Sequence, residues 1–340
     1  MPDAVLPAPP TPRLGDRDAP RWRRELAEAI RDASELRRVL GLPAAVDSPA
    51  DHGFPLLVPR GFAARMRRGD PDDPLLLQVL PRAAEAADVA GFTADPVGES
   101  AALAGPGLVR KYSGRALVLV TGACAVHCRY CFRREFSYAD AGATSGGVES
   151  ALEAIAADES LAEVILSGGD PLLADDPRFA DIVGRLEAIR HVRRLRIHTR
   201  LPVVLPSRVT DRLAGILGGS RLAVVMVIHA NHAAEIDAEV AAALRRLAEA
   251  RCLLLNQAVL LAGVNDSVAD LRTLSERLVD VGVMPYYLHL LDRVRGAAHF
   301  EVSEPRALEL HRALRDSLPG YAVPRLVREV PGEPAKSWLA

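Results

Sequence analysis

The chain has 340 residues, 49% of them hydrophobic, and a formal net charge of -2. This size and content suffice for a sizeable buried core, in one large domain or in one domain with a smaller one beside it. The near-neutral charge argues against nucleic acid or an anionic membrane as a partner, so a small molecule is the expected substrate. The N-terminus has no basic segment followed by an apolar run, and no later stretch is long and apolar enough to span a bilayer, which predicts a cytoplasmic protein.

The N-terminal third is predicted to be helical after a Pro-rich start. Residues 1–20 are rich in Pro and Ala and are expected to form a disordered tail. Residues 22–42 carry apolar side chains at helical spacing and end near a glycine, which predicts one amphipathic helix. The pattern stays mostly helical up to Gly105, broken by Pro-rich turns. Residues 21–108 are therefore predicted to form a helical N-terminal subdomain.

From Arg115 onward, short apolar runs alternate with helical stretches. Strands that alternate with helices form right-handed βαβ units around a parallel sheet. Residues 109–318 are thus predicted to be an α/β unit, a barrel or an open part of one, and residues 319–340 a C-terminal segment. The predicted strands are 116–122, 163–169, 194–200, 222–230, 252–261 and 284–292, and the predicted helices include 146–160, 176–190, 234–250 and 267–282.

Polar residues gather directly at the ends of these predicted strands. In β/α barrels the loops that follow the strands converge on one face, where active sites are built. The clustering therefore indicates an enzyme without reference to any family. The residues concerned are Cys124 to Cys131 after the first strand, Gly168, Gly169 and Asp170 after the second, Thr199 and Arg200, His229 and Asn231, and Asp292.

Three of the four cysteines share one loop, with the spacing Cys124-x-x-x-Cys128-x-x-Cys131. A structural zinc site would need a fourth ligand, and His127 lies between the cysteines, so zinc is one interpretation. Three thiolates also suit a 4Fe-4S cluster that leaves one iron free to bind a cofactor. Cys252 stands apart in an apolar run and is expected to be a buried thiol.

This cysteine spacing resembles that of the radical S-adenosylmethionine (SAM) superfamily. The resemblance implies a partial (β/α)6 barrel, a 4Fe-4S cluster held by the three cysteines, and SAM bound at the free iron. It also implies that Gly168, Gly169 and Asp170 contact the amino group of SAM. Glycines let the backbone approach a ligand closely, and an aspartate accepts from an ammonium. An external one-electron reductase, such as a flavodoxin or a ferredoxin, would supply the electron.

Longer strings narrow the resemblance to the lysine 2,3-aminomutase family. That family implies an isomerase that moves the α-amino group of L-lysine to C3, giving β-lysine, with SAM and pyridoxal 5'-phosphate (PLP) as cofactors. The chain looks most like the compact branch, whose product a separate ligase attaches to elongation factor P. The strings are KYSGRALVLVTGACAVHCRYCFRREF, ILSGGDPLL, HTRLPVVLPSRVT, LNQAVLLAGVND, PYYLHLLD and GYAVPRLVREVPGEPAK.

The chain contains only two lysines, and both match family positions that bind PLP. Lys336 matches the lysine that holds PLP as a Schiff base. Lys111, Tyr112 and Arg115 match the stretch that binds its phosphate, although the family usually has arginine at the first of these positions. An amine can attack a carbonyl whereas a guanidinium stays protonated, which suits a surviving lysine to this chemistry.

Other matches concern the substrate and SAM. Arg133 stands where the family places the cation for the substrate carboxylate. Asp292 and Glu329 match the two acids around the distal ammonium of lysine, whose burial is costly without anions nearby. His229 and Gln257 match positions near SAM.

Three other interpretations stay open at this point. The chain could be a radical SAM aminomutase that acts on another amino acid, or a radical SAM enzyme without PLP in which Lys336 is only a tail residue. A metal-stabilised binding module without catalysis is the third.

Overall fold

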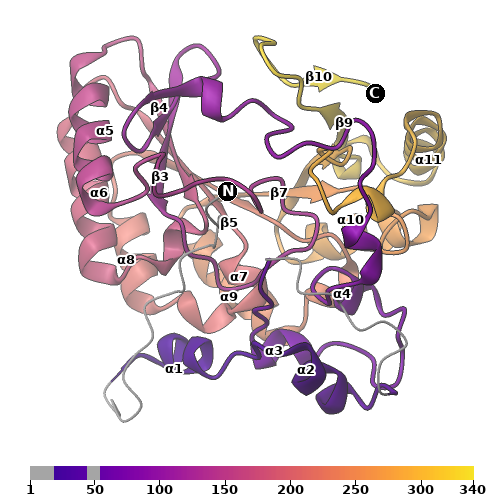
Figure 1. Ribbon diagram of the computed structural model, residues 1–340. Coiled ribbons are helices and arrows are strands. Elements are labelled where there is room, and N and C mark those ends of the chain that lie inside the picture. Colours follow the sequence, from indigo (N-terminus) through magenta and orange to yellow (C-terminus); the bar gives the residue numbers. More distant parts are fainter. Residues whose placement is uncertain (1–18, 44–53) are drawn as a thin grey trace.

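A computed structural model of the protein describes residues 19–43 and 54–340 (Figure 1). The tail expected at residues 1–20 therefore lies outside the described residues, apart from Ala19 and Pro20. One sheet forms the centre, and its strands lie in chain order. They are β1 (Leu103–Gly105), β2 (Leu108–Val109), β3 (Arg115–Thr121), β4 (Glu163–Gly168), β5 (Arg194–Thr199), β6 (Ala223–Ile228), β7 (Leu253–Val259), β8 (Met284–His289), β9 (Arg325–Arg328) and β10 (Ser337–Trp338).

Six strands, β3 to β8, pair in parallel with their neighbours along the chain. They are the six predicted strands, so the α/β partial barrel is confirmed. The prediction omits β9, which extends the parallel sheet, and the antiparallel strands β1, β2 and β10 at its two ends. These four strands are short, and too few residues alternate within them to produce a clear pattern.

Helices connect the parallel strands and lie around the outside of the sheet (Figure 1). Most begin at a Ser, Thr or Asp whose side chain accepts from a backbone N–H of the first turn, as Thr144, Asp175, Asp237 and Ser267 do. No helix in the described part of the chain has the length and apolar content needed to cross a bilayer. The connecting helices are α5 (Ser145–Ala157), α6 (Asp176–Ala188), α7 (Leu201–Val204), α8 (Asp211–Gly218), α9 (Ala238–Glu249), α10 (Val268–Asp280) and α11 (Glu304–Ser317).

The single helix predicted for residues 22–42 is wrong, because the chain there forms two helices. Ile30 exchanges backbone hydrogen bonds of 2.8 and 2.9 Å with Val58, which a continuous helix would not permit. Asp32 then caps the second helix by accepting from the backbone N–H of Glu35 at 2.8 Å, and Gly41 ends it in the left-handed conformation. The N-terminal helices are α1 (Arg21–Ala27), α2 (Ala33–Leu40), α3 (Arg60–Ala63) and α4 (Pro74–Leu77).

The N-terminal elements and the barrel share one hydrophobic core. Trp22, Leu36 and Phe62 belong to the same buried cluster as Val118 of β3 and Ile197 of β5. The N-terminal helices therefore support the barrel directly and do not enclose a core of their own. The division of the chain into segments 21–108, 109–318 and 319–340 remains a proposal.

Candidate active site

Loops at the carboxyl ends of the strands surround a cavity of about 420 Å³. Because parallel strands end at the same edge of a sheet, their loops bring distant parts of the chain together here. All the residues predicted for the site line this cavity. They are Lys111, Tyr112, Arg115, Cys124, Cys128, Cys131, Arg133, Gly168, Gly169, Asp170, His229, Gln257, Asp292, Glu329 and Lys336.

The three clustered cysteines lie on the loop after β3 and keep free thiols. Burial raises the pKa of Cys124 well above its usual range and that of Cys131 to about 11, so both thiols must lose a proton to bind metal. Within the described residues, no three His, Cys, Asp or Glu side chains are gathered as a single metal ion requires. Three thiols that line one cavity are a donor set that suits a 4Fe-4S cluster with one free iron.

Two glycines at the end of β4 pack against the segment that leads into the cysteine loop. The N–H groups of Gly169 and Asp170 donate to the carbonyls of Thr121 and Ala123 at 2.7 and 2.8 Å. A Cβ atom at Gly168 would lie 2.3 Å from the Thr121 oxygen, and one at Gly169 would lie 2.1 Å from the Ala123 oxygen. Gly168 also has a φ of +121°, which side-chain-bearing residues rarely adopt. The glycines therefore fix how the cysteine loop leaves the sheet.

We expect Gly169→Ala to destabilise the protein by at least about 1–3 kcal/mol, because its methyl group would overlap a backbone oxygen. Gly184→Ala is the matched control, since a Cβ at this position in α6 meets nothing within 4 Å. Alanine should stabilise that helix by about 0.5–1 kcal/mol. Urea unfolding of both variants measures the difference. Equal unfolding midpoints would contradict this account of Gly169.

Asp170 is fully engaged by protein donors. Its carboxylate accepts from the Thr199 hydroxyl at 2.7 and 2.9 Å and from the backbone N–H groups of Arg200, Leu201 and Leu172 at 2.8, 3.2 and 3.1 Å. Burial raises the pKa of Asp170 to about 6 in spite of these bonds. The side chain thus ties the loops after β4 and β5 together, whereas the sequence suggests an acceptor for an ammonium.

Lys336 lies directly before β10, lines the cavity and pairs with Glu329. Lys111 donates to the other oxygen of that carboxylate at 3.1 Å. Burial alone would raise the pKa of Glu329, but the two lysines outweigh it and lower the pKa to about 2. The guanidinium of Arg115 lies 4.7 Å from the centre of the Tyr112 ring, and its buried Nε has no hydrogen-bond partner among the described residues. A lysine amine and an arginine with an unsatisfied N–H in the same cavity fit an aldehyde cofactor with a phosphate group.

Arg133 has an acidic partner that sequence reasoning does not identify. Its Nε and Nη2 donate to the two oxygens of Glu99 at 2.6 and 2.7 Å, and its Nη1 donates to the Ser167 hydroxyl at 3.1 Å and the Gly168 carbonyl at 2.8 Å. Glu99 lies on a turn 34 residues before Arg133, and no local pattern marks it. In this structure Arg133 and Glu329, both expected to bind substrate, are thus each paired with a charged protein group.

Asp292 follows β8, and desolvation in the cavity raises its pKa to about 7, although Lys336 opposes this shift. The folded protein then holds a proton between about pH 4 and 7 that an unfolded chain releases, so stability falls as the pH rises through this range. In Asp292→Asn, the free energy of unfolding should decrease less over this pH range. The difference should be about 1.4 kcal/mol for each unit by which the pKa of Asp292 is raised. Urea unfolding at pH 5 and pH 8, without PLP, measures it. Parallel pH profiles for the two proteins would contradict the shift.

His229 after β6 and Gln257 in β7 are joined by a contact of 2.9 Å between the imidazole Nε2 and the amide Nε2. Burial lowers the pKa of His229 to about 3, with Arg200 and Arg133 contributing, so its ring is neutral and can accept from that amide. The prediction omits two further histidines of the cavity, His198 and His289. Each has a buried Nε2 without a hydrogen-bond partner among the described residues.

Comparison with known proteins agrees with these features. Residues 103–198 match the family described as 4Fe-4S single cluster domain. L-lysine 2,3-aminomutase of Escherichia coli (strain K12) is 47% identical over 94% of both chains, and the protein of that name from Haemophilus influenzae is 44% identical over 99% of both. Among solved structures, a radical SAM methyltransferase from Sphaerobacter thermophilus aligns over 65% of this chain, with 20% identity and a TM-score of 0.42. The near-complete coverage at 44–47% identity shows that the chain belongs to the L-lysine 2,3-aminomutase family, as its motifs predict.

Proposed function

We propose that the protein is an L-lysine 2,3-aminomutase, an isomerase that moves the α-amino group of L-lysine to C3 and yields β-lysine. The observation that carries the proposal is the set of side chains that line one cavity. Cluster-type thiols, a lysine amine, an arginine and two acids line the same space at the carboxyl ends of the strands. Relatives of that name share 44–47% of their residues with this chain.

The residues present fit the cofactors of this activity. When bound, the cluster and SAM supply a radical that removes and returns a hydrogen atom, and PLP supplies the conjugated system that carries the migrating nitrogen. Arg115 offers an unsatisfied N–H to a phosphate group. Cys124, Cys128 and Cys131 would hold the cluster, Lys336 would hold PLP, Lys111, Tyr112 and Arg115 would bind its phosphate, and Gly168, Gly169, Asp170, His229 and Gln257 would face SAM.

The protein's own charges select the substrate. Arg133 would bind the α-carboxylate, and Asp292 and Glu329 would surround the distal ammonium, because a buried charge needs an opposite partner. Lysine would have to share Arg133 with Glu99, its present bidentate partner. It would likewise have to share Glu329 with the two lysines. An amino acid without a distal cation gains nothing from the acids, which favours lysine over amino acids with neutral or acidic side chains.

We further propose an electron donor, an enzyme that uses the product and a location in the cell. A flavodoxin or ferredoxin would reduce the cluster, since the electron must come from a partner. A ligase acting on elongation factor P would use the β-lysine, as the resemblance to the compact branch implies. The cytoplasm would be the location, because free cysteines persist in a reducing compartment.

The direct test is product analysis. Protein reconstituted anaerobically with iron and sulfide, then reduced, would be incubated with lysine, SAM and PLP. β-Lysine should form, and its formation should stop when PLP is left out. Another amino acid converted in preference to lysine would overturn the substrate, and β-lysine formed without PLP would overturn the role of Lys336.

A further inference from the structure

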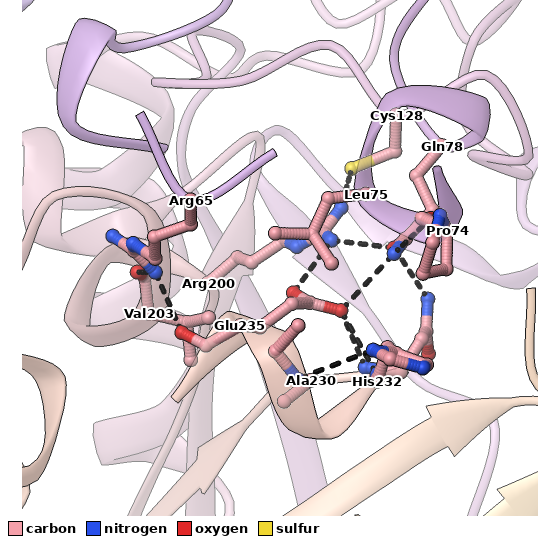
Figure 2. A network of polar contacts seen from close by, with 12 residues as sticks. Arg65, Pro74, Leu75, Gln78, Cys128, Arg200, Val203, Ala230, His232 and Glu235 are labelled. Carbon is pink, nitrogen blue, oxygen red and sulfur yellow. Dashed lines mark hydrogen bonds and ion pairs between the residues drawn. The ribbon is translucent and has the colours of Figure 1, made fainter. Parts of the chain in front are cut away.

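An arginine that sequence reasoning left without a role contacts one of the cluster-type cysteines. Arg200 is the first residue after β5, and its Nη1 donates to the Cys128 sulfur. Its Nη2 donates to Gln78 Oε1 at 2.7 Å and to Glu235 Oε2 at 2.9 Å. Figure 2 shows the guanidinium between the sulfur on one side and the carboxylate on the other. The side chain of Arg200 is 6% exposed and that of Glu235 is 0% exposed.

Other buried groups hold Glu235 in place. Its second oxygen accepts from the backbone N–H groups of Asn231 and His232 at 2.8 and 3.1 Å and from Gln78 Nε2 at 3.1 Å. Gln78 caps the C-terminal end of α4, and Glu235 lies in a short 3-10 helix after β6, so segments distant in sequence meet at Arg200. A buried ion pair often adds little stability compared with apolar side chains, so stability alone does not account for this arrangement.

A charge beside a cluster sulfur acts on the electron affinity of the cluster. The potential of an iron-sulfur cluster depends on its net charge, its exposure and the hydrogen bonds to its sulfurs. Reduction adds a negative charge, which a cation donating to the thiolate stabilises. A carboxylate behind that cation has the opposite effect, and little water is present to screen either charge.

We propose that Arg200 and Glu235 are a pair that sets the reduction potential of the cluster through Cys128, in which Arg200 raises the potential and Glu235 lowers it. This inference rests on the proposed function, in which the three cysteines hold a 4Fe-4S cluster. Both are positioning residues, because they act on the cluster through its sulfur ligand and through each other.

The test is a potentiometric titration of the reconstituted cluster without SAM, followed by electron paramagnetic resonance of the reduced form. Arg200→Met should lower the midpoint potential, and Glu235→Gln should raise it. Each shift should be about 59 mV, which corresponds to a tenfold change in the equilibrium constant for one-electron reduction. Arg200→Lys, which keeps the positive charge, should stay closer to the wild type than Arg200→Met. The potential is read per assembled cluster, so partial loss of folding does not affect it.

A second ion pair, in which the arginine is buried and the aspartate partly exposed, serves as the control. Arg208 is 0% exposed and pairs with Asp176 at 2.8 Å, and neither is among the described residues that line the cavity. Asp176→Asn should leave the potential unchanged. Shifts of equal sign in the Arg200→Met and Glu235→Gln variants, or no shift in either, would overturn the pair's role while leaving the proposed function intact. Failure of the wild type to assemble a cluster would overturn both.

Discussion

Replacing Cys128 with alanine should leave the protein without its iron-sulfur cluster. The thiol lies in the middle of the three-cysteine loop, faces the cavity and is held by Arg200. A cluster that has only three protein ligands cannot lose one and remain stably bound. After anaerobic reconstitution, we expect iron and sulfide contents near background and no deoxyadenosine formed from SAM.

Cys252→Ala is the matched control for this loss. Cys252 is buried in the core and is not among the described residues that line the cavity. This variant should bind as much iron as the wild type and cleave SAM at a similar rate. A Cys128→Ala protein that retained a full, redox-active cluster would contradict the ligand assignment.

Replacing Lys336 with alanine should abolish the visible absorbance of the PLP imine and lower β-lysine formation by about 10³-fold or more, the scale of removing a covalent catalytic group. The cluster should assemble normally, because the cysteines lie on a separate loop. Lys111 would still pair with Glu329, so this carboxylate keeps a cation in the variant.

The Lys111→Arg variant distinguishes the roles of the two lysines. Arginine keeps the positive charge next to Glu329 but cannot form an imine. This variant should keep the imine absorbance, with β-lysine formation reduced much less than in Lys336→Ala. An imine band that persisted in Lys336→Ala and vanished in Lys111→Arg would reverse the assignment of the two residues.

The sequence predicts β3 to β8 well because each carries several buried apolar residues and helices connect them, most with a side-chain cap. It fails where tertiary contacts override the local pattern. Residues 22–42 have the spacing of one helix, yet the pairing of Ile30 with Val58 interrupts it. Helix α8 is omitted because Gly215 and Gly218 weaken its helical signal.

The candidate site, like the fold, is predicted only in part by the sequence. Residues that match motifs at strand ends are found around the cavity, because the topology alone brings these ends together. The acidic partners of two arginines in the site cannot be predicted from the sequence. Glu99 and Glu235 neutralise Arg133 and Arg200, but they lie 34 and 35 residues from them and belong to no recognisable spacing. Only the folded chain shows which acid meets which arginine.

The central claim is that the three cavity-facing cysteines hold a cluster that splits SAM. It is tested most directly by measuring 5'-deoxyadenosine after the anaerobically reconstituted protein is reduced and given SAM. Deoxyadenosine and methionine should form in equal amounts from the wild type, and neither should form from Cys128→Ala. A well-folded, fully iron-loaded and reduced protein that releases no deoxyadenosine would contradict it.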